Sequence, residues 1–378
     1  MRVEQLRWER AGGWQGQGGE LDASVDLVLV FGSRACLDEA RYQELASRYP
    51  DACLMGCTTA GEICNALVSD DSIVASAVAF ADTTVILAQT DIAPGGDSRA
   101  AGQDLAGQLP AEGLIHVFVL SDGLLVNGTD LVAGLRANLP PGVEITGGLA
   151  GDGTAFAETR VIANAPPRTG CIAALGFYGP SLKVGYGSLG GWDTFGPDRL
   201  ITRSQGNVLY ELDGQPALDL YKRYLGEYAA GLPASGLLFP LALRAPDGHS
   251  AGLVRTILAV DEQVGSMTFA GDIPQGAHAR LMKANFERLI DGAAGAAEAS
   301  RTGLHGGKAE LALLISCVGR KLVLQQRVEE EVECVRQVLG PDPAMCGFYS
   351  YGEISPFQPT ARCELHNQTM TITTFAEA

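Results

Sequence analysis

One hydrophobic pattern occurs three times along the chain. Each copy starts with a short run of mostly apolar residues, passes a turn of small residues, continues with helical spacing of apolar positions, and ends in a second apolar run. The first runs of the three copies are residues 26–31, 114–120 and 310–315. Apolar runs of this length are typical of buried strands. The pattern therefore predicts repeated strand–helix–strand units in an α/β fold, with a mixed α+β arrangement left open.

The copies also share the way they end. Helical spacing covers residues 37–49 and 129–138, and a third helix, with its charges on one face, is predicted over 322–339. The first copy ends in Gly56-x4-Gly61-Glu62-Ile63 and the third in Gly347-x4-Gly352-Glu353-Ile354. Chance matching of these residues is the alternative, but each motif closes a unit of similar size. The shared context favours an internal duplication.

Between the second and third copies the pattern changes to strands. Residues 170–178 and 183–188 alternate in polarity on either side of Gly179-Pro180, which predicts a β-hairpin. Residues 192–204 contain Gly and Pro without clear periodicity, so we place a domain boundary there. The expected organisation is a poorly ordered segment over 1–24, an N-terminal domain over 25–195 and a C-terminal domain over 196–373.

Composition limits the kinds of partner. At 378 residues the chain is too long to fold around one ordinary hydrophobic core. Hydrophobic residues make up 46% of it, which is enough to form a large buried interior. The formal net charge is −17. Nucleic acids and anionic membranes both require a basic surface on the protein that binds them. We therefore expect no binding to nucleic acid and none to membranes.

The ends of the chain and its cysteines indicate the compartment. No run approaches the roughly 18 apolar residues that a membrane helix requires. The first ten residues mix charges of both signs and lack an apolar core, so no signal peptide is predicted and a cytoplasmic location is expected. The nine cysteines include no Cys-x-x-Cys pair, which favours free thiols over disulfides and gives little support for a zinc site.

Three corners rich in small residues follow the second apolar runs, over residues 56–61, 147–153 and 347–352. Glycine lets a ligand approach the backbone closely, and α/β folds bind ligands at the carboxyl ends of their strands. Taken singly, each set of glycines is explained by a tight turn; together they predict one shared pocket. From the first two corners its candidate contacts are Gly56, Cys57, Thr58, Thr59, Gly61, Glu62, Gly147, Gly148, Gly151 and Asp152.

The remaining candidate contacts carry charge or a hydroxyl group. Glu62 and Glu353 lie at equivalent ends of the duplicated motif, where each either binds a ligand amine or caps a helix. Arg320 either binds an acidic ligand group or, as the favoured interpretation, pairs with one of these carboxylates. Tyr349 and Tyr351 either line the pocket or fill a core.

Cys317 is a further candidate ligand contact, and it also allows an enzymatic alternative. A thiol at a strand end, with His366 and Glu353 elsewhere in the chain, has the composition of a nucleophilic triad. No hydrolase motif surrounds Cys317, so a buried or redox-responsive thiol is favoured. The chain also has no Walker motif and no dinucleotide fingerprint. We therefore expect no enzyme and no nucleotide cofactor.

Several motifs together resemble the FIST family of bacterial sensory proteins, which carry an N-terminal and a C-terminal FIST domain. The resemblance covers about residues 26–373 and rests on residues 56–63, 147–152, 209–218, 316–320, 347–354 and 365–369. It implies intracellular sensing of a small-molecule ligand. No kinase, cyclase or DNA-binding segment is attached, so the chain is similar to stand-alone members that signal in trans.

A subset of those stand-alone proteins senses nitric oxide through haem. The resemblance therefore implies haem as a candidate cofactor, and a histidine kinase, diguanylate cyclase or phosphodiesterase as partner; homodimerisation stays open. Haem needs an axial ligand, and His366, within the motif Leu365-His366-Asn367, is the first choice. A structural hydrogen bond is the commoner use of such a histidine. The alternative function is haem-free sensing of amino-acid-like metabolites.

Overall fold

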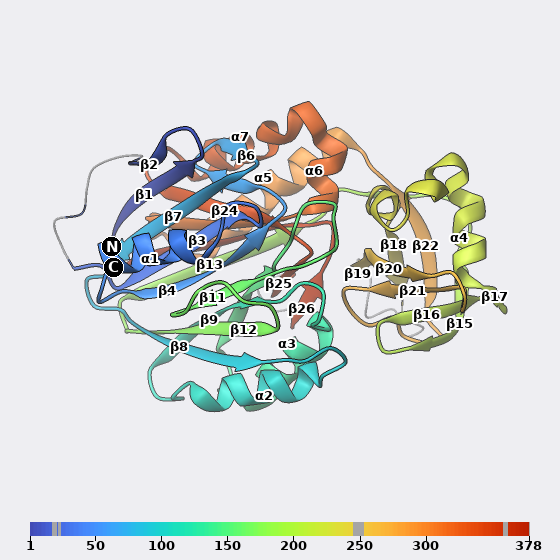
Figure 1. The fold of residues 1–378 in the computed structure, drawn as a ribbon, viewed down its shortest axis with the longest axis horizontal. Helices are drawn as coiled ribbons and strands as arrows, with labels where there is room; N and C mark the ends of the chain where they lie inside the picture. Colours follow the sequence, from blue (N-terminus) through green and yellow to red (C-terminus); the bar gives the residue numbers. More distant parts are fainter. Residues whose placement is uncertain (17–20, 22–23, 245–252, 358–361, 378) are drawn as a thin grey trace.

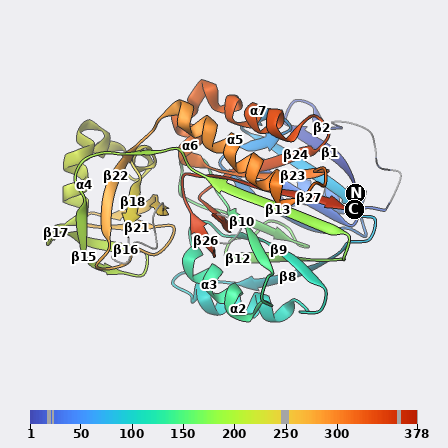
Figure 2. The same ribbon diagram turned by 180° about the vertical axis from the view of Figure 1, so that it is seen from behind.

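The computed structural model describes residues 1–16, 21, 24–244, 253–357 and 362–377, which form a large and a small body (Figure 1). Three six-stranded sheets make up the large body, and a nine-stranded sheet makes up the small body. The small body comprises residues 193–283, between two stretches of chain that both belong to the large body. The first and last described residues lie together at the far end of the large body (Figure 2).

Each sheet of the large body contains one of the predicted units. The parallel strand pairs are β3 (Leu27–Ser33) with β4 (Cys53–Thr59), β9 (Leu114–Ser121) with β10 (Glu144–Leu149), and β23 (Leu311–Cys317) with β24 (Ala344–Ser350). Beside the first strand of each pair runs an antiparallel strand, namely β7 (Ser72–Ala79), β12 (Cys171–Tyr178) or β27 (Met370–Glu377). The predicted α/β fold is confirmed, and the three units share one strand arrangement.

The helices that connect the parallel strands follow the predicted spacing in two of the three units. They are α1 (Glu39–Arg48), whose N-cap Asp38 accepts a bond from a main-chain N–H, and α3 (Gly128–Asn138), capped in the same way by Asn127. The third is not the single helix predicted over 322–339. It is divided into α6 (Val318–Leu324), the 3₁₀ turn η3 (Gln325–Arg327) and α7 (Val328–Leu339). The break falls at Gln325, whose φ of 49° does not fit a right-handed helix.

Short strands are exchanged between the three sheets in a cycle. β5 (Glu62–Cys64) follows β4 along the chain but pairs with β24, and β25 (Gly352–Pro356) follows β24 but pairs with β10. β11 (Val161–Ala163) follows β10 and pairs with β4. Every unit thus gives one strand to another sheet, and one buried cluster contains Phe31, Phe118 and Phe348 from the three units.

The outer strands correct two predictions. β1 (Arg2–Glu9), which pairs with β7 and with β2 (Gly13–Gly16), lies in the segment predicted to be poorly ordered; it is ordered because Leu6 and Trp8 are buried. Residues 17–20 and 22–23 of that segment lie outside the described residues. The predicted hairpin is also wrong. β12 is flanked by β9 and β8 (Thr84–Asp91), so no edge is left for β13 (Leu182–Leu189), which pairs with β27.

The other elements of the large body complete its edges and faces. They are β6 (Leu67–Ser69), β26 (Cys363–His366), α2 (Ser98–Gln108) and α5 (Phe286–Gly303). In Figure 1, α2 and α3 cover one side of the large body, and α5, α6 and α7 lie on the other. Among the described residues, no helix combines the length and apolar character that crossing a membrane requires.

The small body has its own core, which includes Leu209, Tyr221 and Phe269. The predicted C-terminal domain begins close to its first strand, but the chain after residue 283 returns to the large body and completes the third sheet. The elements of the small body are β14 (Asp193–Thr194), β15 (Arg199–Gln205), β16 (Val208–Leu212), β17 (Gln215–Pro216), α4 (Ala217–Leu225), η1 (Gly226–Gly231), η2 (Ala234–Leu238), β18 (Leu241–Arg244), β19 (Leu253–Arg255), β20 (Ile257–Asp261), β21 (Ser266–Phe269) and β22 (His278–Lys283).

Candidate functional site

The three predicted corners meet inside the large body. The main-chain N–H of Ala60 donates to the carbonyl of Tyr349 at 2.8 Å, and the N–H of Tyr349 donates to the carbonyl of Gly61 at 2.8 Å. The N–H of Gly151 donates to the carbonyl of Thr58 at 2.9 Å. Main-chain donors of the corners thus bond one corner to another. None of the hollows described below is lined by a corner residue.

Three glycines of the corners are required by the packing of the parallel strands. A Cβ atom added to Gly56 would lie 2.0 Å from a carbonyl oxygen of the neighbouring strand, and the corresponding distances are 1.9 Å for Gly147 and 1.8 Å for Gly347. At Gly148 the nearest atom, from the Ile315 side chain, would be 2.9 Å away. A larger side chain fits at none of these positions. Packing therefore accounts for these glycines, and their contact with a ligand stays a prediction.

Glu62 is fully buried and holds its corner to the start of β7. Its carboxylate accepts bonds from the Thr59 hydroxyl at 2.5 Å, the Ser72 hydroxyl at 2.7 Å and the Ser72 N–H at 3.2 Å. Burial raises the pKa of Glu62 to about 7, although these hydrogen bonds oppose the shift. The carboxylate joins two parts of one unit and caps no helix.

The other two units also have a buried carboxylate that binds the start of their antiparallel strand, although Asp122 follows the first strand of its unit and Glu353 the second. Glu353 accepts bonds from the Ser350 hydroxyl at 2.6 Å and from the N–H and hydroxyl of Thr369, just before β27, and burial raises its pKa to about 8. Asp122 accepts a bond from the N–H of Gly170, just before β12, at 2.9 Å. Sequence analysis did not include Asp122, although it follows a buried strand directly. All three carboxylates anchor the antiparallel strand of their own unit.

Arg320 forms an internal ion pair, but with neither corner glutamate. Its side chain has no exposed surface, and its guanidinium lies 2.8 Å from the carboxylate of Glu331, which is equally buried. It also donates to the carbonyls of Leu289 at 2.6 Å and Gly190 at 3.0 Å. The Tyr349 hydroxyl donates to the same Glu331 carboxylate at 2.7 Å. This network is satisfied within the core, which leaves Arg320 and Tyr349 with structural partners.

Tyr351 links its corner to the surface. Its hydroxyl donates to the Asp152 carboxylate and to the carbonyl of Gly153. Its ring stacks on Phe156, with the ring centroids 4.7 Å apart. The Asp152 carboxylate also accepts the main-chain N–H of Ala157 at 2.9 Å. Asp152 and Tyr351 therefore stabilise the loop after β10.

The candidate thiols are buried. Cys317 is 1% exposed and Cys57 has no exposed surface. Burial raises the pKa of both thiols well above the ordinary value, and the Glu353 carboxylate adds to this at Cys317. A thiolate is the nucleophilic form of cysteine, so these surroundings disfavour nucleophilic chemistry at Cys317.

His366 is placed as a structural histidine. It pairs with Glu353 between β25 and β26, is 4% exposed, and its Nε2 is hydrogen-bonded to the carbonyl of Ser355 at 2.9 Å. Burial lowers the pKa of His366 to about 4, so the ring is neutral at pH 7 and Nε2 donates the proton. These surroundings do not fit an axial haem ligand. Across the described residues, no three His, Cys, Asp or Glu side chains form a group that could hold a metal ion.

A hollow of about 530 Å³ lies where the large and small bodies meet, and we call it the junction hollow. Figure 1 shows α3 and β26 of the large body on the side that faces the small body. Its volume falls within the range of about 300–1,000 Å³ that is usual for small-molecule sites. The hollow is lined by Arg99, Thr129, Val132, Ala133, Arg136, Ala137, Leu253, Arg255, Asp272, Pro274, Arg362, Cys363, Glu364 and Leu365.

Arg255, the last residue of β19, is the buried charged group of this hollow. Its side chain reaches from the small body into the large one and donates to the carbonyl of Leu365 at 3.0 Å and the hydroxyl of Thr129 at 3.3 Å. Within the small body it donates to the carbonyls of Asp272 and Val254. Burial lowers its pKa to about 10, so the guanidinium stays charged at pH 7. Arg255 was not among the residues predicted from the sequence. Its place within the mainly apolar run Leu253–Leu258 could have indicated a buried arginine.

A second hollow, of about 620 Å³, lies beside the junction hollow and is also shared by the two bodies. It contains the N-terminal residues of α2 and α3 together with Phe156, and Gly206 and Leu258 of the small body. The Asn127 side chain donates to the Asp272 carboxylate at 2.7 Å, which joins the bodies there. None of the described residues that line it is basic.

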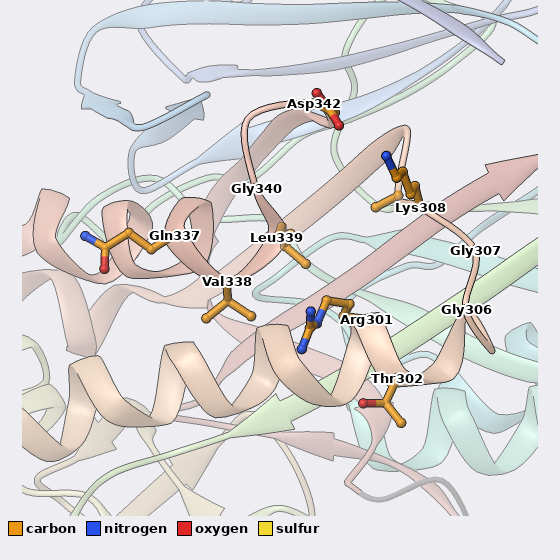
Figure 3. Close-up of a pocket in the computed structure, with 11 residues that line it drawn as sticks. Arg301, Thr302, Gly306, Gly307, Lys308, Gln337, Val338, Leu339, Gly340 and Asp342 are labelled. Carbon is orange, nitrogen blue, oxygen red and sulfur yellow. The ribbon is translucent and has the colours of Figure 1, made fainter.

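A third hollow, of about 500 Å³, lies at the C-terminal ends of α5 and α7 (Figure 3). Its cationic side chains are Arg301 and Lys308, and Arg301 forms an ion pair with Glu298 of its own helix. Of the described residues that line it, none is a buried charged side chain. The junction hollow is therefore the better candidate site.

Comparison with known proteins identifies the family. The FIST N domain matches residues 26–215 and the FIST C domain matches residues 217–356. No curated protein matches the chain in sequence. Among solved structures, a cyanuric acid hydrolase is 10% identical with a TM-score of 0.27, covering 100% of this chain and 99% of its own. Cyanuric acid hydrolase from A. caulinodans is 11% identical with a TM-score of 0.18, covering 78% of this chain and 99% of its own. Both similarities are too weak to support an argument about function. The chain belongs to the FIST family, whose domains are small-ligand sensor domains of signal transduction.

Proposed function

We propose that this protein senses a small ligand that binds in the junction hollow and changes how the small body contacts the large one. The observation that supports this most is that both bodies line the hollow and that Arg255 spans them. A ligand there touches both bodies at once, so it stabilises one arrangement over others.

The contacts beside the hollow suggest how the change is transmitted. The motif over residues 365–369, which carries the family resemblance, holds the small body: Thr256 donates its N–H to Asn367 at 3.2 Å, and Gln368 donates to the carbonyl of Leu237 at 2.9 Å. The same stretch continues into Thr369, which is bonded to Glu353 in the core. In this proposal the motif couples the junction hollow to the large body.

A signalling enzyme would read the changed arrangement in trans. We keep a histidine kinase or a cyclic-di-GMP enzyme as the proposed partner, in keeping with the family. Sensing is preferred over catalysis because the thiol that suggested an enzyme, Cys317, is buried with a raised pKa. Haem is not part of the proposal, since the surroundings of His366 do not fit it.

Fluorescence energy transfer between the bodies tests the proposal. Labels attached to Glu112→Cys on the large body and Gln263→Cys on the small body both replace exposed residues, and most native thiols are buried. We expect fractions of a bacterial small-molecule extract that raise the melting temperature to change the transfer efficiency as well. Ligand fractions that raise the melting temperature without any change in transfer would contradict the proposal. So would a Soret band in the purified protein that responds to nitric oxide.

A further inference from the structure

We infer that the junction hollow binds a small organic anion, whose carboxylate or phosphate group is held by Arg255 and whose apolar part lies against α3 and β26. This inference names the ligand class of the proposed sensor, and it rests on the proposed function for what happens after binding. Binding itself can be measured independently of that function.

First, Arg255 carries a buried positive charge with no ion pair in the described structure. It is 2% exposed, yet no carboxylate lies within ion-pair distance of it in the described part of the chain. Four of its N–H groups donate to neutral oxygens, namely the main-chain carbonyls of Asp272, Val254 and Leu365 and the hydroxyl of Thr129. The second N–H on Nη2 has no hydrogen bond to the described residues. The Asp272 and Glu364 carboxylates act on Arg255 only from beyond ion-pair distance. A buried charge without a counter-ion in contact is costly, and guanidinium matches carboxylates and phosphates in geometry. An anion in the hollow supplies the missing partner.

The second argument is the charge around the opening. Arg99, Arg136 and Arg362 are exposed residues that also line the hollow. Over the residues that the structure describes, none of the three forms an ion pair, whereas most arginines elsewhere on the surface do. Four arginines thus surround one hollow in a chain of net charge −17. Such a cluster attracts anions and repels cations.

The acidic residues of the hollow do not cancel this charge. Asp272 and Glu364 line it against four arginines. The Asp272 carboxylate is already an acceptor for the Asn127 side chain at 2.7 Å, and Glu364 is exposed. The balance therefore favours a ligand with one or two negative charges.

The third argument is the apolar wall. Val132 and Ala133 of α3, Leu253 of β19 and Leu365 of β26 line the same hollow. Cys363 does not add a reactive group, since its buried thiol donates to the carbonyl of Ile145 at 3.2 Å. Apolar walls with a few polar groups are usual for small-molecule sites. The ligand therefore has an apolar part as well as an anionic group.

Gly271 provides an independent way to disturb the site. A Cβ atom there would lie 2.5 Å from the Thr129 hydroxyl, 2.7 Å from Leu365 and 3.2 Å from the guanidinium carbon of Arg255. The variant Gly271→Ala therefore shifts Arg255 without removing its charge.

Calorimetric titration of the full chain with three probes of equal chain length tests the inference. We expect octanoate and octyl phosphate to bind, and octanol to bind at least tenfold more weakly, because a charged hydrogen bond contributes about 1.5–3 kcal/mol. Whichever anion binds more tightly identifies the head group. Equal affinity for octanol and both anions, or no binding of either anion, would overturn the inference. If inorganic phosphate bound as tightly as octyl phosphate, the inference that the hollow also holds an apolar part of the ligand would be overturned.

Variants locate the binding. Arg255→Met should weaken anion binding at least tenfold, Gly271→Ala should weaken it severalfold, and Arg99→Gln with Arg136→Gln should weaken it severalfold. Because these last two arginines are exposed, their replacement tests the site even if Arg255→Met does not fold. The matched control is Arg203→Gln, an exposed arginine of the small body that is ion-paired with Glu211, and it should leave the affinity unchanged. Unchanged affinity in the Arg99→Gln, Arg136→Gln double variant would place the anion elsewhere.

The failure of this inference is distinguishable from failure of the proposed function. Anion binding that is lost in the variants but leaves energy transfer between the bodies unchanged contradicts the sensing mechanism and supports the site. A change in transfer caused by neutral extract fractions, without anion binding, supports the mechanism and overturns the inference.

Discussion

Arg320 and Arg255 are both buried, but they lie in regions of opposite character. Arg320 belongs to the centre of the large body, where Glu331 balances its charge and three carbonyls accept its other donors. Arg255 belongs to the junction, where its described partners are neutral oxygens and where it lines a hollow. Burial alone therefore does not separate a structural arginine from a binding one. The presence of an internal counter-ion does.

The same difference distinguishes the three corners from the junction. In the corners, main-chain groups bond across units, and the buried carboxylates of Glu62, Asp122 and Glu353 each hold a strand of their own unit. At the junction, charge and apolar surface meet around open space. The core behaves as a closed scaffold, and the region that we propose responds to a ligand lies where the two bodies meet.

The largest expected effect is on the buried ion pair. Arg320→Met leaves the Glu331 carboxylate buried without its partner, so the free energy of unfolding should fall by about 3–5 kcal/mol. Chemical denaturation measures this. The double variant Arg320→Met, Glu331→Gln should recover part of the lost stability. A loss below about 1 kcal/mol in the single variant would show that the ion pair of Arg320 does not stabilise the core.

The next effect is a dependence of stability on pH. Folded Glu62 and Glu353, with pKa values of about 7 and 8, keep protons that unfolded carboxyl groups near their model value of 4.5 have lost. The folded state then binds more protons, so stability falls as pH rises. Up to about pH 7 the buried His366 and His116 act in the opposite sense, because their pKa values are lowered from a model value of 6.5 and only the unfolded state takes up their protons.

The two carboxylates therefore contribute most of the change between pH 7 and 8. There the free energy of unfolding should fall by about 1 kcal/mol, as followed by denaturation at several pH values. Glu353→Gln should make the curve flatter. A stability that rises over this window would mean that the corner carboxylates are ionised in the folded protein and are not the buried anchors described above.

A smaller loss is expected at the junction. Arg255→Met removes a charge without leaving a carboxylate behind, so the cost should be about 1–3 kcal/mol, from the carbonyls that lose a donor. Comparing its denaturation curve with that of Arg320→Met sharpens the contrast between the two regions. An equal or greater loss at Arg255 would indicate that it too serves mainly to hold the fold together.

The smallest effect on stability is expected at the opening of the hollow. Arg99→Gln and Arg136→Gln should each change the free energy of unfolding by no more than about 0.5 kcal/mol, because both residues are exposed and unpaired within the described structure. They should still weaken the binding of octyl phosphate and reduce its dependence on salt. Destabilisation by more than about 1 kcal/mol would assign them a structural role.

The sequence predicted the repeated units because their strands and helices follow local periodicity. It also predicted that the first and third corners are related, since Glu62 and Glu353 share a motif. The exchange of β5, β11 and β25 between sheets was not predictable, because pairing between distant strands leaves no periodic signal. The proposed site was missed for a similar reason. Arg255, Thr129 and Leu365 come from three distant segments, and only the fold brings them together.

Hydrogen–deuterium exchange with and without octyl phosphate tests the central claim most directly. The account predicts slower exchange in α3, β19 and β26 around the junction hollow, and unchanged exchange in the corners over residues 56–61 and 347–352. Protection confined to the corners, with α3, β19 and β26 unaffected, would contradict it.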